Sequence, residues 1–193
     1  MPGAPLSAHV AAASLNQTVG DWAGNTRRIR AAIADARSRG AKLLLLPEMC
    51  IPGYSLGDRL MMRGTLERSL AALGEILPDT AGMVVVLGLP YRHRDVLYDA
   101  AAVCADGRIV GIVPKENLAT GDVEYENRWF SGWPRGHVEE TEDGIPFGSL
   151  LFDAPGIGRF GVEICEDGWK GIRPGSVYAL AGAHLILNPS ASA

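Results

Sequence analysis

Three residues that can do chemistry each follow an apolar run of strand length. They are Glu48 after the run 43–47, Lys115 after the run 109–114, and Cys165 after the run 157–164. In an open α/β sheet, ligands bind beyond the carboxyl ends of the strands. A thiol there is a candidate nucleophile when a base and an oxyanion stabiliser reach it. A carboxylate and an ammonium can fill those two roles, so the pattern predicts covalent catalysis by a cysteine.

The thiol needs help because its reference pKa of about 8.5 lies above neutral pH. Burial at a strand end raises the pKa of a carboxyl, which suits Glu48 to general base catalysis. Lys115 can be the nearby cation and can also stabilise a developing oxyanion. Each residue has a structural alternative. Glu48 is alternatively a solvent-exposed loop acid, Lys115 a solvated surface lysine, and Cys165 a buried apolar filler, as free cysteines often are. We keep that interpretation for Cys104, which lies within a predicted strand, and leave Cys50 open.

The elements that must position these residues alternate between strand and helix patterns, which predicts a mixed α/β sheet. We expect strands at 9–15, 43–47, 83–89, 96–113 (a hairpin turning at 105–107), 150–152, 157–164 and 185–187. We expect helices from Asn25 as N-cap to Gly40, over 66–77 with Leu66, Leu70, Leu73 and Leu77 on one face, and over 175–181. The stretch 115–133 is a long polar and aromatic loop, and loops of this length are usually functional.

The composition is that of one globular domain. The chain has 193 residues, 47% of them hydrophobic and 21% charged, with a net charge of −4. No basic cluster points to nucleic acid, no apolar run is long enough to span a membrane, and no signal peptide is recognisable. Three widely spaced cysteines and four scattered histidines argue against disulfides and a metal site. Reduced thiols favour a cytoplasmic location.

The chain resembles the nitrilase (carbon–nitrogen hydrolase) superfamily, whose Glu-Lys-Cys triad occurs in the same chain order. The segments that carry this likeness are Leu46-Pro47-Glu48-Met49, Val113-Pro114-Lys115-Glu116-Asn117 and Ile164-Cys165-Glu166-Asp167-Gly168-Trp169. Within the superfamily the chain is most similar to the glutaminase domain of glutamine-dependent NAD synthetases. That narrower likeness lies in the segments 13–17, 52–54, 126–130, 161–169 and 185–192.

The resemblance implies a nitrilase-type four-layer α-β-β-α sandwich over residues 1–193 and hydrolysis of the glutamine amide. Cys165 would attack the side-chain amide and form a thioester, while Glu48 would act as general base and then as general acid. Lys115 would stabilise the oxyanion together with the backbone N–H of Glu166. The supporting residues it implies are Glu126 near the catalytic groups, and Tyr54, Glu166 and Ser192 at the substrate.

The resemblance also implies partners and cofactors. The glutaminase reaction would need no cofactor. Its ammonia would amidate deamido-NAD to NAD in a synthetase domain that binds ATP and Mg. No Ser-Gly-Gly-x-Asp-Ser motif of such a domain occurs here, and the family domain has further elements after the strand 185–187. We therefore expect a domain incomplete at its C-terminus and, because that strand has nothing after it to cover it, a homo-oligomer.

The chain departs from the family pattern in one segment, and several alternatives stay open. The departure is at Asn117 to Asp122, where members of the family commonly have a Leu-Pro-x-Tyr sequence after the lysine. Glu126 is alternatively an exposed loop acid paired with Arg128, and Tyr54 alternatively only packs. The chain is alternatively a free-standing hydrolase of another small amide, or a fragment without activity.

Overall fold

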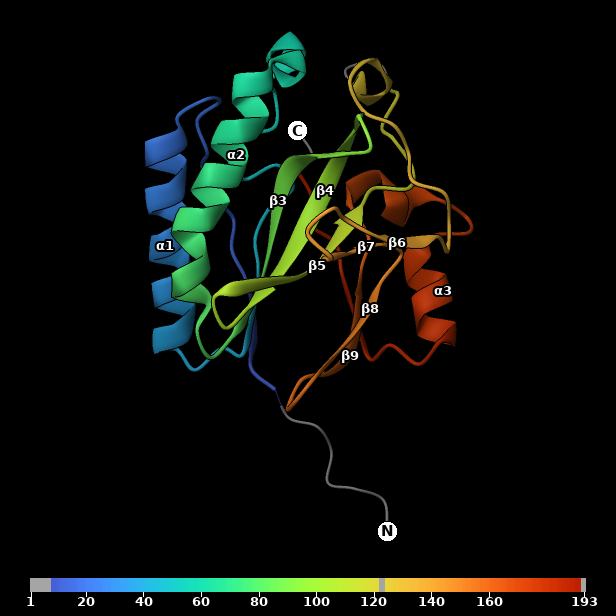
Figure 1. Cartoon of the computed structure of the whole chain (residues 1–193). Helices are drawn as coiled ribbons and strands as arrows, with labels where there is room; N and C mark the ends of the chain where they lie inside the picture. Colours follow the sequence, from blue (N-terminus) through green and yellow to red (C-terminus); the bar gives the residue numbers. More distant parts are fainter. Residues whose placement is uncertain (1–7, 122–123, 192–193) are drawn as a thin grey trace.

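The computed structural model describes residues 8–121 and 124–191, to which the structural statements below refer. These residues form two β-sheets with helices on the outer face of each (Figure 1). Helices α1 (Trp22–Ser38) and α2 (Arg63–Ile76) cover a seven-stranded sheet, and helix α3 (Pro174–Leu180) covers a three-stranded sheet. The predicted four-layer α-β-β-α arrangement is confirmed.

The larger sheet is mixed, as predicted. Its strands are β1 (Val10–Ala12), β2 (Leu43–Leu45), β3 (Val84–His93), β4 (Val96–Ala105), β5 (Arg108–Pro114), β6 (Val138–Glu140) and β7 (Pro146–Gly148), in the order β1-β2-β3-β4-β5-β7-β6. β1, β2 and β3 run parallel, and β4 is antiparallel to both β3 and β5. β2 and β5 therefore point the same way, so their carboxyl ends lie at one edge of the sheet.

The smaller sheet contains β8 (Leu151–Ala154), β9 (Gly158–Val162) and β10 (Leu185–Leu187), in the order β10-β9-β8. β8 and β9 form an antiparallel pair, whereas β10 runs parallel to β9. α3 packs closely against this sheet, because a Cβ atom added at Gly161 would lie 2.4 Å from the Tyr178 ring. The small residue in β9 thus lets the helix approach.

The central strands β2, β3 and β4 of the larger sheet are buried on both faces, which explains why they are mostly apolar. Alternate side chains of a strand point to opposite faces. Leu44 and Val85 face the core beneath α1 and α2, whereas Leu43 and Val86 face the core between the two sheets. The residues that follow the strands of this sheet, such as Glu48 and Lys115, therefore lie next to two packed cores.

The start of α1 differs from the prediction. Its N-cap is Asp21, whose carboxylate accepts a hydrogen bond from Gly24 N at 2.9 Å. Asn25 lies inside the helix and is fully buried. Its side-chain amide donates to the carbonyls of Thr18 and Ile51, both at 2.9 Å. Asn25 therefore anchors two loops to the helix, so its assignment as N-cap was wrong.

One residue of the predicted α2 face is also misplaced. Leu66 and Leu73 are buried as expected, but Leu70 is 46% exposed. The buried stripe continues instead through Ser69, whose hydroxyl donates to Thr65 O at 2.9 Å, and through Ile76. A serine that satisfies its hydroxyl within its own helix can lie on the core face.

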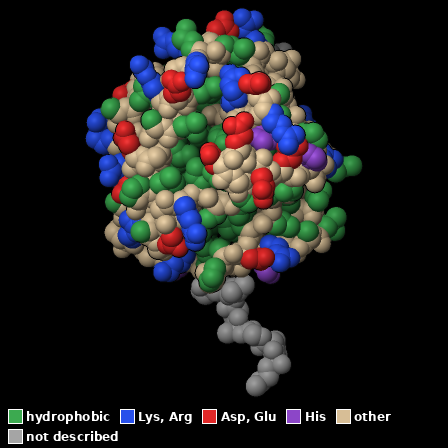
Figure 2. All heavy atoms as spheres, in the orientation of Figure 1, with side chains coloured by type: hydrophobic (Ala, Val, Ile, Leu, Met, Phe, Trp, Pro, Cys, Tyr) green, Lys and Arg blue, Asp and Glu red, His purple; other side chains and the backbone are tan. Residues whose placement is uncertain are grey.

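Four 3₁₀ helices complete the described elements: η1 (Gly57–Met61), η2 (Leu77–Thr80), η3 (Glu126–Arg128) and η4 (Cys165–Trp169). η3 lies within the long loop 115–133. No helix among the described residues is both long and apolar enough to cross a membrane. Acidic and basic side chains are interspersed on the face shown in Figure 2.

Candidate active site

The centre of the candidate site is the ammonium of Lys115, the first residue after β5. Its side chain is fully buried, and its Nζ atom donates to Glu48 Oε1 and to Glu126 Oε1, each at 2.7 Å. Both carboxylates are buried as well. The structure therefore brings together three of the residues that the sequence singled out, although 67 positions separate Glu48 from Lys115.

The backbone holds Glu48 in place by a close crossing over β3. A Cβ atom added at Gly88 would lie 2.2 Å from Met49 N and 2.7 Å from Glu48 Cα. Contacts below 3.0 Å between a Cβ and backbone do not occur without displacement of one of them. Only glycine at this position of β3 lets the Glu48 loop lie so close to the sheet.

Lys115 continues the sheet pairing beyond β5. Its backbone N–H donates to the carbonyl of Asp99 in β4 at 2.9 Å. Burial opposes a charge on the Lys115 side chain, but the three carboxylates of Asp99, Glu48 and Glu126 outweigh it and raise the pKa of Lys115. The lysine is therefore a cation throughout the neutral range.

Glu126, in η3, is a buried member of this network. Its Oε1 atom also accepts a hydrogen bond from Tyr54 Oη at 2.6 Å, and its Oε2 atom accepts one from Ala119 N at 2.7 Å. Burial, followed by the contact with Glu126, raises the pKa of Tyr54, so the phenol is a neutral donor. Arg128 pairs with Asp58 at 2.8 Å, not with Glu126. The alternative in which Glu126 is an exposed loop acid is wrong.

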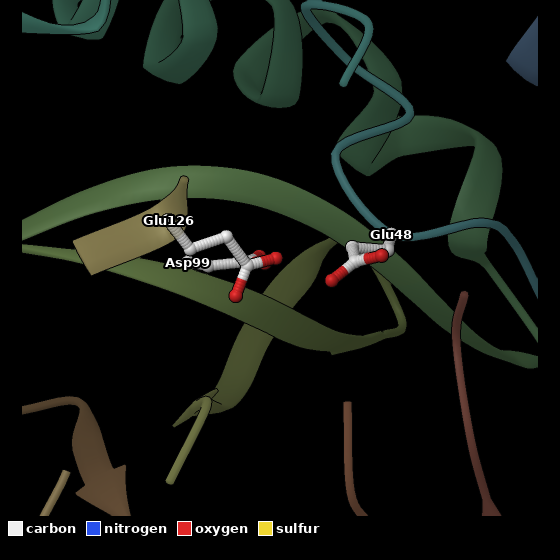
Figure 3. A group of neighbouring side chains, drawn as sticks. All are labelled: Glu48, Asp99 and Glu126. Atoms are coloured by element: carbon white, nitrogen blue, oxygen red, sulfur yellow. The ribbon is translucent and has the colours of Figure 1, made fainter. Parts of the chain in front are cut away.

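Asp99 is a third carboxylate here, and the sequence analysis missed it. Its side chain is fully buried, and carboxylate atoms of Glu48, Asp99 and Glu126 lie within 4.8 Å of one another. The three side chains point toward one another (Figure 3). Lys115 supplies positive charge to this group of acids, with its Nζ atom 3.7 Å from Asp99 Oδ2.

Cys165 begins η4, three residues beyond the end of β9, and is 9% exposed. Its φ angle is +45°, a left-handed conformation that is uncommon outside glycine. Its N–H donates to Asn188 Oδ1 at 3.1 Å and to Pro189 O at 3.0 Å. The residues after β10 therefore fix the sharp turn that carries the thiol. The N–H of Glu166, in the first turn of η4, belongs to the groups that a helix leaves without a partner of its own.

Asp167 joins the cysteine turn to the lysine segment. Its Oδ1 atom accepts a hydrogen bond from Asn117 N at 2.7 Å, and its Oδ2 atom accepts one from Ile164 N at 2.9 Å. The side chain is 1% exposed, and burial raises its pKa despite these donors. The sequence assigned Asp167 only to a motif, but the structure shows that it links two of the three strand ends.

A second link runs from the cysteine turn to Glu48. Beyond Asn188 and Pro189, the N–H of Ala191 donates to Glu48 Oε2 at 2.8 Å. One short segment after β10 thus contacts both the backbone of Cys165 and the carboxylate of Glu48. All three predicted catalytic residues are therefore connected by hydrogen bonds, directly or through one intervening segment.

The predicted substrate residues have different surroundings. Tyr54 lines two neighbouring cavities, of about 290 Å³ beside Glu48 and Ala191 and of about 180 Å³ beside Glu126. Glu166 is half-buried and forms an ion pair with Lys170. Ser192 lies outside the described residues. Tyr54 is thus the predicted substrate residue that the structure places at a cavity.

The other two thiols are enclosed. Cys50 and Cys104 are buried, and burial raises the pKa of each to about 12. At neutral pH they are protonated, which makes them poor nucleophiles. Cys104 lies within β4, as predicted, and the structure shows that Cys50 is buried as well.

Comparison with known proteins agrees with this fold. A family model of the carbon–nitrogen hydrolases matches residues 9–193. The chain therefore belongs to the carbon–nitrogen hydrolase family. It is 35% identical over 190 residues to the glutamine-dependent NAD(+) synthetase of Mycobacterium tuberculosis, and 33% identical over 197 residues to that of Homo sapiens. Each match covers 95% of this chain but 28% of the relative.

Solved structures give the same result. The crystal structure of a glutamine-dependent NAD(+) synthetase from Cytophaga hutchinsonii matches with a TM-score of 0.86 and 35% identity, over 96% of this chain and 30% of that chain. An amidase from Nesterenkonia sp. matches with a TM-score of 0.76 and 21% identity, over 96% of this chain and 65% of that chain. At that identity the likeness to the amidase supports the fold alone.

Proposed function

We propose that this chain hydrolyses the side-chain amide of glutamine through a cysteinyl thioester at Cys165. The observation that carries the proposal is the buried Lys115 ammonium held between the carboxylates of Glu48 and Glu126. In this arrangement the carboxylate of Glu48 can act as the base and the ammonium of Lys115 as the oxyanion stabiliser. The similarity to glutamine-dependent NAD(+) synthetases supports glutamine as the substrate.

Acylation uses groups of the chain only. Glu48 takes the thiol proton of Cys165, and the thiolate attacks the amide carbon. The C=O electron pair moves onto oxygen, where the Lys115 ammonium and the N–H of Glu166 stabilise the negative charge. The tetrahedral intermediate then collapses, the C–N bond breaks, and Glu48 returns the proton to the departing ammonia.

Deacylation repeats these steps with water. Glu48 removes a proton from the water molecule as its oxygen attacks the thioester carbon. The C–S bond breaks, Cys165 recovers its proton from Glu48, and glutamate leaves. Lys115 and the N–H of Glu166 stabilise the second oxyanion as they did the first. Glu126 and Tyr54 keep the lysine in position, because Glu126 accepts hydrogen bonds from both.

The ammonia has a proposed use beyond this chain. We propose that it amidates deamido-NAD to NAD in an ATP- and Mg-dependent synthetase domain, with the present residues acting as the glutaminase part. The support is that the chain spans 28% of the length of the NAD(+) synthetases it matches. Binding of the two parts can be measured with a separately expressed synthetase domain.

The experiment is a substrate comparison with a covalent readout. Release of ammonia from glutamine is measured against asparagine, small aliphatic amides and nitriles, with Cys165→Ala as the blank. A glutamine-mimicking electrophile should modify Cys165 and no other thiol. A clear preference for another amide would favour the free-standing amidase alternative. Absence of both turnover and modification would favour a chain without activity.

A further inference from the structure

Asp99 is a carboxylate outside the proposed triad and lies within the largely apolar strand β4. Its side chain is fully buried, and neither of its carboxylate oxygens has a hydrogen-bond donor among the described residues. The Nζ atom of Lys115 is 3.7 Å from Asp99 Oδ2, beyond hydrogen-bond distance. A buried polar group without a partner requires an explanation.

Hydrogen-bond donors are distributed very unequally among the three carboxylates of this site. Glu48 accepts from Lys115 Nζ and Ala191 N, and Glu126 accepts from Lys115 Nζ and two further donors. Asp99 accepts from none of the described residues. Donors stabilise the ionised form of a carboxylate. Of the three acids, Asp99 is therefore the one whose surroundings favour the neutral form.

The charged groups around Asp99 also favour its neutral form. Glu48 reaches Asp99 from the loop after β2, Lys115 from the end of β5, and Glu126 from η3. Tyr54, a neutral phenol, donates a hydrogen bond to Glu126. Pro90, which pairs with Asp99 across β3 and β4, carries no titratable group. Three ionised acids would thus share one buried ammonium. Two like charges in contact favour retention of a proton on one of them.

We propose that Asp99 stays protonated in the resting site and donates its proton in a hydrogen bond to Glu48, so that it acts as a neutral positioning residue for the general base. A carboxylic acid is both a donor and an acceptor, whereas two carboxylates in contact have no donor between them. The proton thus turns an unsatisfied contact into a hydrogen bond. Burial, followed by the charge of Glu48, raises the pKa of Asp99, in agreement with this assignment.

A neutral Asp99 also affects the lysine. The ammonium of Lys115 has three N–H groups, and Glu48 and Glu126 accept two of them. An ionised Asp99 would compete for the third. A protonated Asp99 leaves that N–H available to the substrate oxyanion. The functional part of this inference rests on the proposed function, but the protonation state of Asp99 does not.

The protonation state is tested without any activity measurement. The infrared difference spectrum between the unsubstituted chain and Asp99→Asn is recorded at neutral pH. We expect loss of the carbonyl stretch of a neutral carboxylic acid. Asp153→Asn in β8 is the matched control: Asp153 pairs with Arg159 at 2.9 Å, which lowers its pKa, so that substitution should remove carboxylate bands only. Loss of only carboxylate bands from Asp99→Asn would overturn the proposal.

The positioning role is tested by the pH profile of kcat/KM for glutamine. Asp99→Asn keeps the shape and a hydrogen-bond donor, so it should stay within about threefold of the unsubstituted chain with an unchanged acid limb. Asp99→Leu loses the donor and should fall by about tenfold or more, as expected for a hydrogen bond to a charged group. An Asp99→Asn variant as impaired as Asp99→Leu would refute the neutral-donor role. If the chain has no glutaminase activity, the proposed function fails while the infrared result still decides the protonation state.

Discussion

Removal of the Lys115 ammonium is the sharpest test of the buried network. Lys115→Met keeps the length of the side chain but takes a charged donor from both Glu48 and Glu126. Among the described residues Glu48 then retains one donor, Ala191 N, for a carboxylate on a fully buried side chain. Breaking a buried ion pair from one side costs about 3–5 kcal/mol because the remaining charge is uncompensated. We expect a loss of this size in the free energy of unfolding.

The cause of that loss can be isolated by a double-mutant cycle. In the Lys115→Met background, Glu126→Gln removes one of the stranded charges, so the double variant should lose less stability than the sum of the two single variants. Contacting residues of this kind couple by about 0.5–3 kcal/mol. Arg63→Met is the control, because Arg63 pairs with Glu67 at 2.9 Å on the exposed surface of α2. Its loss should stay within about 0.5 kcal/mol.

The assay is urea unfolding followed by circular dichroism, with the midpoint and the slope fitted together. Glutamine hydrolysis by the same Lys115→Met protein should fall by about 10² to 10³ fold, the usual effect of removing one oxyanion donor. Additive losses in the cycle, or a Lys115→Met protein destabilised by less than about 1 kcal/mol, would refute the reasoning that the ammonium neutralises buried carboxylates.

Four further predictions use other parts of the site. Cys165→Ser should abolish glutamine turnover, while Cys104→Ser should leave kcat nearly unchanged. Thiol labelling at pH 8 should be confined to Cys165, because burial raises the pKa of Cys50 and of Cys104 to about 12. Glu48→Gln should slow acylation by about 10² to 10⁴ fold in single-turnover measurements, since it removes the base; an unchanged rate would exclude that role. Gly88→Ala should displace the Glu48 loop and lower kcat, whereas Gly74→Ala, at an open position of α2, should leave it unchanged. The folded-state pKa of Asp99 is raised, so the folded chain binds its proton more tightly than the unfolded chain and loses stability as pH rises from about 4 toward that raised value. Asp99→Asn lacks this loss, and its stability relative to the unsubstituted chain should increase over that window in urea titrations; a constant difference would contradict the raised pKa.

The sequence predicted the ends of β2 and β5 to within two residues, because the physical cause of these ends is local. A run of apolar residues that stops at a polar one marks both the strand and its end. Glu48 and Lys115 were placed correctly for that reason, and the directions of β2 and β5 then bring them to one edge. Glu126 was found only through the family resemblance, since nothing in the loop 115–133 shows that one of its acids is buried.

The errors have tertiary causes. Asp21 and Asn25 both have N-cap chemistry within one turn, and the buried carbonyl of Ile51 decides that Asn25 lies inside the helix. Leu70 belongs to the apolar stripe predicted from the sequence, but the buried face of α2 includes Ser69 and leaves Leu70 exposed. Asp99 did carry a signal that was overlooked. It is a carboxylate within a strand buried on both faces, and such a group is almost never left without a partner or a proton.

Cys165, the proposed nucleophile, is positioned less by its own strand than by the segments that surround it. Cys165 has a left-handed backbone, a conformation that costs on the order of 1–3 kcal/mol when the residue is not glycine. The conformation persists because Asn188 and Pro189 accept hydrogen bonds from the N–H of Cys165. In addition, Asp167 connects the same turn to Asn117 by a hydrogen bond. The residues that follow β5, β9 and β10 therefore hold the thiol jointly. A change in any one of these segments should alter the direction of the thiol without disturbing either sheet. The geometry of the site and the stability of the fold therefore depend on different parts of the chain.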